Sequence, residues 1–221
     1  MCHMSRIFTI FGTKWIENMI ISKQIEQKIK ILPAGTLLFI DDFIEEYDYE
    51  TARKILQRLT NDGQLMRLTR GIYYKPKKDN LLGIIKPTAE QIAESISKRD
   101  KARIIPTGSF ALHKLGLTTQ VPMNVVYLTD GSPRKIKVGI QKITLKKTSP
   151  KNLAVKHYLS GLIIQGLKEI GEGKVNASHL SQIRKIIVNS HDVSQIKMNM
   201  RYAPVWVQKI VIKILKDLNN E

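Results

Sequence analysis

The chain of 221 residues contains one cysteine, Cys2, so it cannot form an internal disulfide. That scarcity fits a reducing compartment, where disulfides are rare. No apolar run approaches the roughly 20 residues that a membrane-spanning helix needs. Residues 1–18 carry only a short apolar patch and no small-residue cleavage site, so they do not read as a signal peptide. We therefore expect a cytoplasmic protein without a membrane span.

Motifs of catalysis and metal binding are also lacking. The histidines do not follow metal-ligand spacing, and neither a phosphate-binding glycine-rich motif nor a zinc-protease or hydrolase motif is present. The strongest enzyme-like feature is Gly108-Ser109 at the start of an expected helix, which is an arrangement that holds phosphate in nucleotidyltransferases. That chemistry needs paired metal-binding carboxylates downstream, and Asp130 stands alone. We therefore expect no metal, no cofactor and no catalytic residue.

Acidic residues are scarce, and the charges are unevenly placed. The chain has 36 Lys and Arg against 19 Asp and Glu, a net charge of +17. Residues 36–50 hold 6 acidic and no basic side chains, residues 49–78 hold 8 basic and 2 acidic, and residues 131–157 hold 8 basic and no acidic. A preference for lysine codons would raise the net charge without separating it in this way. A polyanionic partner is indicated: nucleic acid, an anionic surface or an acidic protein.

The clearest helix begins after Asp48 and ends before Gly63. Its apolar residues recur at the spacing of one buried stripe: Ala52, Ile55, Leu56 and Leu59. Gly63 suits the left-handed conformation that often follows a helix. The opposite face carries side chains that can contact base edges or phosphates in the major groove of DNA: Thr51, Arg53, Lys54, Gln57, Arg58 and Asn61.

A basic hairpin follows this helix in the segment MRLTRGIYYKPKK, residues 66–78. Alternation predicts that Met66, Leu68, Ile72 and Tyr74 face inward and that Arg67, Thr69, Tyr73 and Lys75 face outward. Gly71 supplies the turn. Five basic residues are expected to meet the DNA backbone or minor groove: Arg67, Arg70, Lys75, Lys77 and Lys78. The alternative is an edge strand that charge protects from aggregation.

The order of elements predicts an α+β protein with an N-terminal winged helix-turn-helix. A helix from Ser22, as its N-cap, to Lys30 precedes a strand at 36–39, a short helix from Asp41, the helix after Asp48 and the hairpin. We expect an extension at 1–18, the winged helix at 19–78, a linker at 79–88 and a mixed α/β domain at 89–221. Strands and then helices at about 152–170, 177–189 and 203–218 are expected in that domain.

Two phrases of the sequence resemble the AbiEi family, the antitoxins of abortive-infection, type IV toxin–antitoxin systems in phage defence. They are RGIYYKP in the hairpin and PTGSFALHKLGLTTQVPMNVVYLTDGSPRKIKVG from residue 106. The likeness runs from about Met19 to the mid-160s and more loosely to the end.

The resemblance implies a non-enzymatic, two-domain protein. Its winged helix would bind inverted repeats in double-stranded DNA of its own promoter and act as a transcriptional repressor, with contacts at Arg53, Lys54, Arg58, Arg67 and Arg70. Its second domain would be an antitoxin domain that counters a nucleotidyltransferase-type toxin, with or without a direct complex. Charge alone marks Arg134, Lys135 and Lys137 as an antitoxic surface. The remaining alternatives are a plain transcriptional regulator and a nucleotide- or RNA-processing enzyme that uses Gly108-Ser109.

Overall fold

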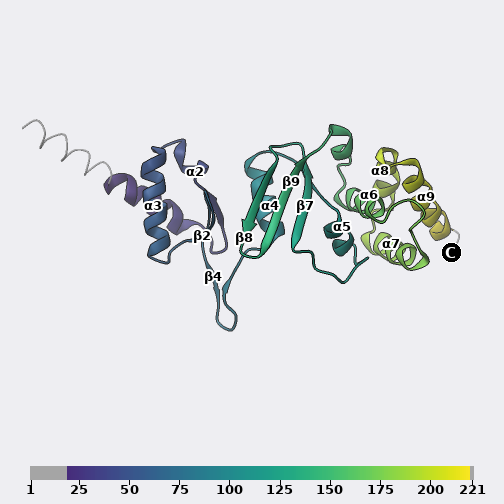
Figure 1. Ribbon diagram of the computed structural model, residues 1–221, viewed down its shortest axis with the longest axis horizontal. Helices are drawn as coiled ribbons and strands as arrows, with labels where there is room; N and C mark the ends of the chain where they lie inside the picture. Colours follow the sequence, from purple (N-terminus) through teal and green to yellow (C-terminus); the bar gives the residue numbers. More distant parts are fainter. Residues whose placement is uncertain (1–18, 220–221) are drawn as a thin grey trace, which may run out of the picture. The chain divides into compact units, whose positions relative to one another are not determined.

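The computed structural model describes residues 19–219 and divides the chain into two compact units, one ending at Thr88 and the other beginning at Ala89 (Figure 1). Helices and sheets occur in both units, which confirms the α+β class. The expected extension at 1–18 lies outside the described residues. None of the helices that the structure describes is long and apolar enough to cross a membrane.

Unit 1 begins with a helix whose described part covers residues 19–31. The elements that follow are β1 (Leu37–Phe39), α2 (Asp41–Ile44), α3 (Tyr49–Asn61), β2 (Met66–Thr69), β3 (Ile72–Tyr74), β4 (Lys77–Asp79) and β5 (Gly83–Ile85). Strands β1, β3 and β2 form an antiparallel sheet in that order, so β3 is the central strand.

The apolar stripe of α3 forms the core of unit 1, as its spacing predicts. Its four apolar residues are all buried and pack against Ile25 and Ile29 of the first helix and against Leu38 and Tyr73 of the sheet. Burial of these side chains stabilises the unit mainly through the hydrophobic effect, by about 1.5–3 kcal/mol for each fully buried large apolar side chain. Helix α3 is therefore held firmly, with its opposite face toward solvent.

Tyr73 and Ser22 of unit 1 do not lie where the sequence predicts. Tyr73 is 2% exposed rather than outward-facing, because β3 has a strand on each side and is covered on both faces. Ser22 lies inside the first helix and is not its N-cap; its hydroxyl donates a hydrogen bond to Glu26 one turn later. Alternation identifies an outward face only where one face of a sheet is open to solvent.

The segment expected as a linker, 79–88, includes part of a second hairpin. Strands β4 and β5 pair antiparallel, and Figure 1 shows them as a ribbon separate from the three-stranded sheet. The carboxylate of Asp79 accepts hydrogen bonds from the backbone N–H groups of Leu81 and Leu82, which closes the turn. Side chains that bond locally in this way favour turns.

Unit 2 is a four-stranded sheet followed by a helical cluster. Its elements are α4 (Ala89–Arg99), β6 (Ile104–Thr107), α5 (Ser109–Lys114), β7 (Asn124–Thr129), β8 (Arg134–Val138), β9 (Gln141–Lys147), α6 (Tyr158–Ile170), α7 (Ala177–Ser190), α8 (Val193–Asn199) and α9 (Val205–Asn219), with short 3-10 turns before α6 and α9. The strand order is β6-β7-β9-β8, and only the central pair, β7 and β9, is parallel.

The helices of unit 2 enclose a second core that joins α5, α6, α7, α8 and α9. The expected helices after residue 150 are present, with two differences. The first begins at Tyr158 rather than near 152, because a 3-10 turn occupies Pro150–Leu153. The other is the seven-residue helix α8, which is too short to produce a clear periodic pattern.

Candidate nucleic-acid interface

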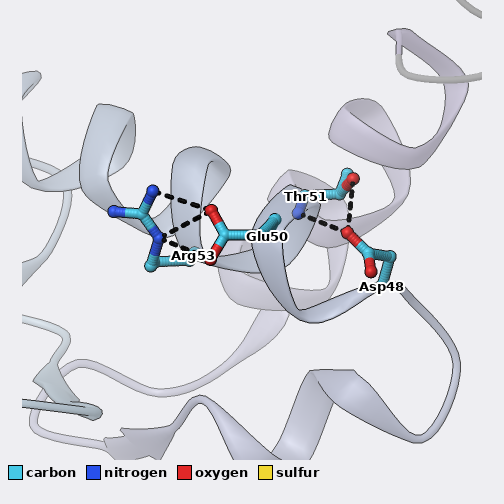
Figure 2. A network of polar contacts seen from close by, with 4 residues as sticks. All are labelled: Asp48, Glu50, Thr51 and Arg53. Atoms are coloured by element: carbon cyan, nitrogen blue, oxygen red, sulfur yellow. Dashed lines mark hydrogen bonds and ion pairs between the residues drawn. The ribbon is translucent and has the colours of Figure 1, made fainter.

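The start of α3 is fixed by the side chain of Asp48. This carboxylate accepts hydrogen bonds from the backbone N–H of Thr51 at 3.1 Å and from its hydroxyl at 3.3 Å (Figure 2). A side-chain cap satisfies one of the N–H groups that the first helical turn leaves without a partner. Thr51, expected as a DNA contact, therefore has its hydroxyl engaged in the cap.

Arg53 is held by Glu50 on the same turn of α3. Figure 2 shows the guanidinium lying against the carboxylate, with Nη2 at 2.8 Å and Nε at 3.1 Å from Oε2. These hydrogen bonds lower the pKa of Glu50 from its ordinary value. Both side chains are about half exposed, with relative areas of 47% and 57%. The pair is an exposed contact of small energetic weight that another anion can replace.

Lys54, Gln57 and Asn61 form the middle of the solvent-facing stripe of α3. Their spacing of three and four residues places them on one side of the helix. The amide of Gln57 donates to the side-chain oxygen of Asn61 at 3.1 Å. Lys54 is exposed and has no hydrogen bond or ion pair among residues 19–219. The stripe therefore presents one cation and two amides together, as the sequence predicts.

Arg58 lies at the edge of this stripe and contacts the first helix. Its guanidinium forms an ion pair with Glu26 and donates to the hydroxyl of Ser22 at 2.8 Å. The partners lie more than thirty positions away, so no local pattern could reveal them. Two of the four arginines expected to contact DNA, Arg53 and Arg58, are thus neutralised by carboxylates of the protein itself.

Arg67 and Arg70 extend the exposed cationic surface onto the hairpin β2–β3. Arg67 is opposite Tyr73 in the sheet register, so its side chain lies on the face that packs toward α3. Arg70 precedes Gly71, which turns the chain with a φ of +74°. Both arginines are exposed, and neither has an ion pair within the part of the chain that the structure describes. We call Lys54, Arg67 and Arg70 the open cationic triad.

Lys75 does not face outward, and this expectation is wrong. Its ammonium donates to the carbonyl oxygens of Ile29 at 3.0 Å, Lys30 at 2.8 Å and Leu32 at 2.6 Å. Those carbonyls belong to the end of the first helix, where backbone acceptors lack helical partners and the helix dipole is negative. Lys75 therefore acts as a C-terminal cap supplied by the residue that follows β3, far along the chain.

Replacing Lys75 should weaken the fold more than any contact with DNA. In Lys75→Met the apolar stem remains and the ammonium is lost, so we expect a loss of about 1–2 kcal/mol in the free energy of unfolding. Lys77→Met is the matched control, because Lys77 is exposed on β4. Thermal unfolding of the full chain measures both. Equal unfolding temperatures for the two variants would contradict the capping role.

Lys77 and Lys78 lie on β4 and not on the hairpin β2–β3. Both are exposed. They are cations of the second hairpin, whose strand β5 accepts a hydrogen bond at the Ile85 carbonyl from the hydroxyl of Tyr74. Their charge thus belongs to a neighbouring surface of unit 1.

The three residues expected as an antitoxic surface do not share one face of the sheet. Arg134 is opposite Leu145 in the register and donates to Asp100, after α4, at 2.7 Å. Lys135 and Lys137 alternate with Ile136, which is buried, and both are exposed. The grouping by charge alone is therefore wrong for Arg134, because neighbouring residues of a strand point to opposite faces.

The Gly108-Ser109 region is a turn that leads into a short helix. Gly108 has a φ of +66° and precedes the six-residue helix α5, on which Ser109 is exposed. Asp130 accepts hydrogen bonds from the backbone N–H and the guanidinium of Arg103, and these lower its pKa. Among residues 19–219 no group of three His, Cys, Asp or Glu side chains is placed to hold a metal ion. The arrangement is that of a turn and a helix start.

Comparison with known proteins identifies a family and finds similar solved structures. The family model described as "Family of unknown function (DUF6088)" matches residues 24–195. No protein of curated function matches significantly. A crystal structure of the RV2827C protein from Mycobacterium tuberculosis aligns with 11% identity and a TM-score of 0.46, covering 88% of this chain and 75% of that one.

Proposed function

We propose that this chain, which belongs to the DUF6088 family of unknown function, is a cytoplasmic protein that binds double-stranded DNA through a winged helix-turn-helix in unit 1. In this proposal α2 and α3 are the helix-turn-helix, α3 enters the major groove, and β2–β3 is a short wing. The order of elements and the sheet order β1-β3-β2 support it. So does the connection of four residues, 45–48, between the two helices.

The observation that carries the proposal is the open cationic triad. Lys54 comes from α3, Arg67 from the strand that follows it and Arg70 from the turn of the hairpin, and all three are exposed. None of the three has an ion pair among the described residues, so their charges are available for phosphate or for guanine. Five of the nine acids among residues 19–88 lie instead on α2 and the turn that follows it: Asp41, Asp42, Glu45, Glu46 and Asp48. A helix and a wing that are basic together suit adjacent contacts on one duplex.

Binding to the DNA upstream of the chain's own gene tests the proposal. Fluorescence anisotropy with that duplex and with an unrelated duplex should give a clear preference for the former. Affinity should fall steeply between about 50 and 200 mM salt, because several phosphates are neutralised. Equal affinity for both duplexes would contradict sequence-specific binding, and no binding at low salt would contradict the proposal as a whole.

The ion pair of Arg53 gives a sharper expectation for the same assay. In Glu50→Gln the guanidinium is released and a negative charge beside the DNA is removed, so we expect affinity to rise about three- to tenfold. Glu45→Gln is the matched control, because Glu45 is exposed outside α3 and loses the same charge. Equal affinities of the two variants would contradict a DNA contact at Arg53.

We extend the proposal to an antitoxin and autorepressor on the strength of the AbiEi-like phrases in both halves of the sequence. The partner would be a nucleotidyltransferase-type toxin encoded beside this gene, and the chain would have no catalytic role. Co-expression tests this role: growth arrest by the neighbouring gene product should be relieved by this chain. Unrelieved arrest, or a neighbouring gene of another kind, favours the plain transcriptional regulator.

A further inference from the structure

The register of unit 2 collects four lysines on one face of its sheet. Lys137 is directly opposite Lys142, and Lys135 is opposite Thr144, two positions before Lys146 on β9. Residues paired across strands, or two apart on one strand, lie on the same face. Lys135, Lys137, Lys142 and Lys146 therefore form one surface, which we call the lysine face.

The other face of the sheet is part of the protein core. Ile136, Ile143 and Leu145 alternate with the lysines and are buried. Helix α4 lies against this side of the sheet (Figure 1). The lysines are thus not distributed over both faces, as a general excess of lysine would produce. The pleat of the strands places all four on the face that α4 does not cover.

The lysine face is open to solvent over strands β8 and β9. All four lysines are exposed, and Val126 of the neighbouring strand is half-buried. Helix α6 covers the opposite end of this face, where Gly161 approaches Ile105 of β6. Within the part of the chain that the structure describes, none of the four lysines has an ion pair. Like charges placed directly opposite each other destabilise a sheet. An external anion bound beside Lys137 and Lys142 would relieve this repulsion.

We propose that the lysine face binds the phosphodiester backbone of a nucleic-acid duplex. Lysines adjacent across strands are about 5 Å apart and those two positions apart on a strand about 7 Å, so the face extends over about 13 Å from Lys142 to Lys146. Over that length one strand of a duplex carries about four phosphates. Ammonium groups contact phosphate as point charges without reading sequence. The register places no aromatic residue on this face, which disfavours stacking with unpaired bases.

This contact would add affinity that does not depend on sequence. It uses residues of unit 2 alone and does not rest on the winged helix proposed for unit 1. It also replaces the expected surface of Arg134, Lys135 and Lys137 with one in which Lys142 and Lys146 take the place of Arg134.

The test uses the full chain with the open cationic triad already replaced by glutamine, so that unit 1 contributes little. In this background K135Q/K137Q/K142Q/K146Q removes the lysine face. The control K185Q/K209Q/K213Q/K216Q removes the same charge from exposed positions of α7 and α9. Anisotropy with an unrelated DNA duplex, the same duplex as RNA and a single strand is measured at two salt concentrations. Thermal unfolding verifies that both variants remain folded.

We expect the lysine-face variant to lose about tenfold or more in duplex affinity and about 3.6 in the salt slope, since four phosphate contacts disappear. The control should stay within about threefold of its parent, because its lysines lie away from the face. Equal losses would overturn the lysine face, as would tighter binding of the single strand through the same residues. The function proposed for unit 1 is contradicted by a different result: the unaltered chain would show no preference for upstream DNA.

Discussion

Replacing the open cationic triad with glutamine, K54Q/R67Q/R70Q, should lower affinity for the upstream duplex by about 100-fold or more at moderate salt. Three contacts worth about 1 kcal/mol each multiply in the binding constant. The salt slope should fall by about 3, because three fewer phosphates are neutralised. Fold stability should change little, since the three side chains are exposed and have no internal ion pair among the described residues.

The control for this variant is K185Q/K209Q/K213Q, which removes the same charge from α7 and α9 of unit 2. Loss of net charge alone would weaken both variants to a similar degree. The single variants Arg53→Gln and Arg58→Gln should each lose less DNA affinity than single glutamine variants of Lys54, Arg67 or Arg70. Each of these arginines must break its ion pair with a carboxylate of the protein before it can bind phosphate, and the loss of that ion pair reduces its net contribution to DNA affinity. Similar losses of DNA affinity in the triad variant and its control would contradict a DNA interface on unit 1.

Tyr73→Ala should unfold unit 1, with a loss of about 3–5 kcal/mol in its free energy of unfolding. The side chain is 2% exposed on the central strand and packs with residues of α3 and of the first helix. Small domains have stabilities of only about 5–15 kcal/mol, so the loss is a large part of the total. DNA binding by unit 1 should disappear with its fold, while the separate core of unit 2 persists.

Tyr73→Phe separates packing from the hydroxyl. The ring is kept, so the loss should stay below about 1 kcal/mol. Circular dichroism follows both variants during thermal unfolding, and the alanine variant should show an early, partial loss of helix. A Tyr73→Ala chain that unfolds like the unaltered one would place this side chain in solvent, as the alternating pattern of the hairpin suggests.

Local patterns predicted what local physics determines. The spacing of Ala52, Ile55, Leu56 and Leu59 predicted the buried face of α3, and hence its exposed face. Asp48 predicted the helix start, because an N-cap needs only the next three residues. The turn at Gly71 followed from a positive φ that glycine adopts without strain.

Long-range contacts determine the positions of the residues whose orientation was predicted wrongly from the sequence. Lys75 caps a helix more than forty positions earlier, and Tyr73 is buried because α3 and the first helix pack on its face of the sheet. Arg134 is separated from Lys135 by the pleat and joined to Asp100 by tertiary packing. The lysine face could have been predicted in part, since Lys135 and Lys137 alternate with Ile136. Its two other members required the register between β8 and β9.

Amide hydrogen exchange of the full chain, with and without its upstream duplex, tests the winged-helix proposal most directly. A bound duplex should slow exchange in the exposed first turns of α3 and in residues 66–74, where the triad lies. Residues 134–147 should be protected by either duplex, upstream or unrelated. Protection of α3 and the hairpin by the upstream duplex is the predicted result. Unchanged exchange in both segments at saturating DNA would contradict the account.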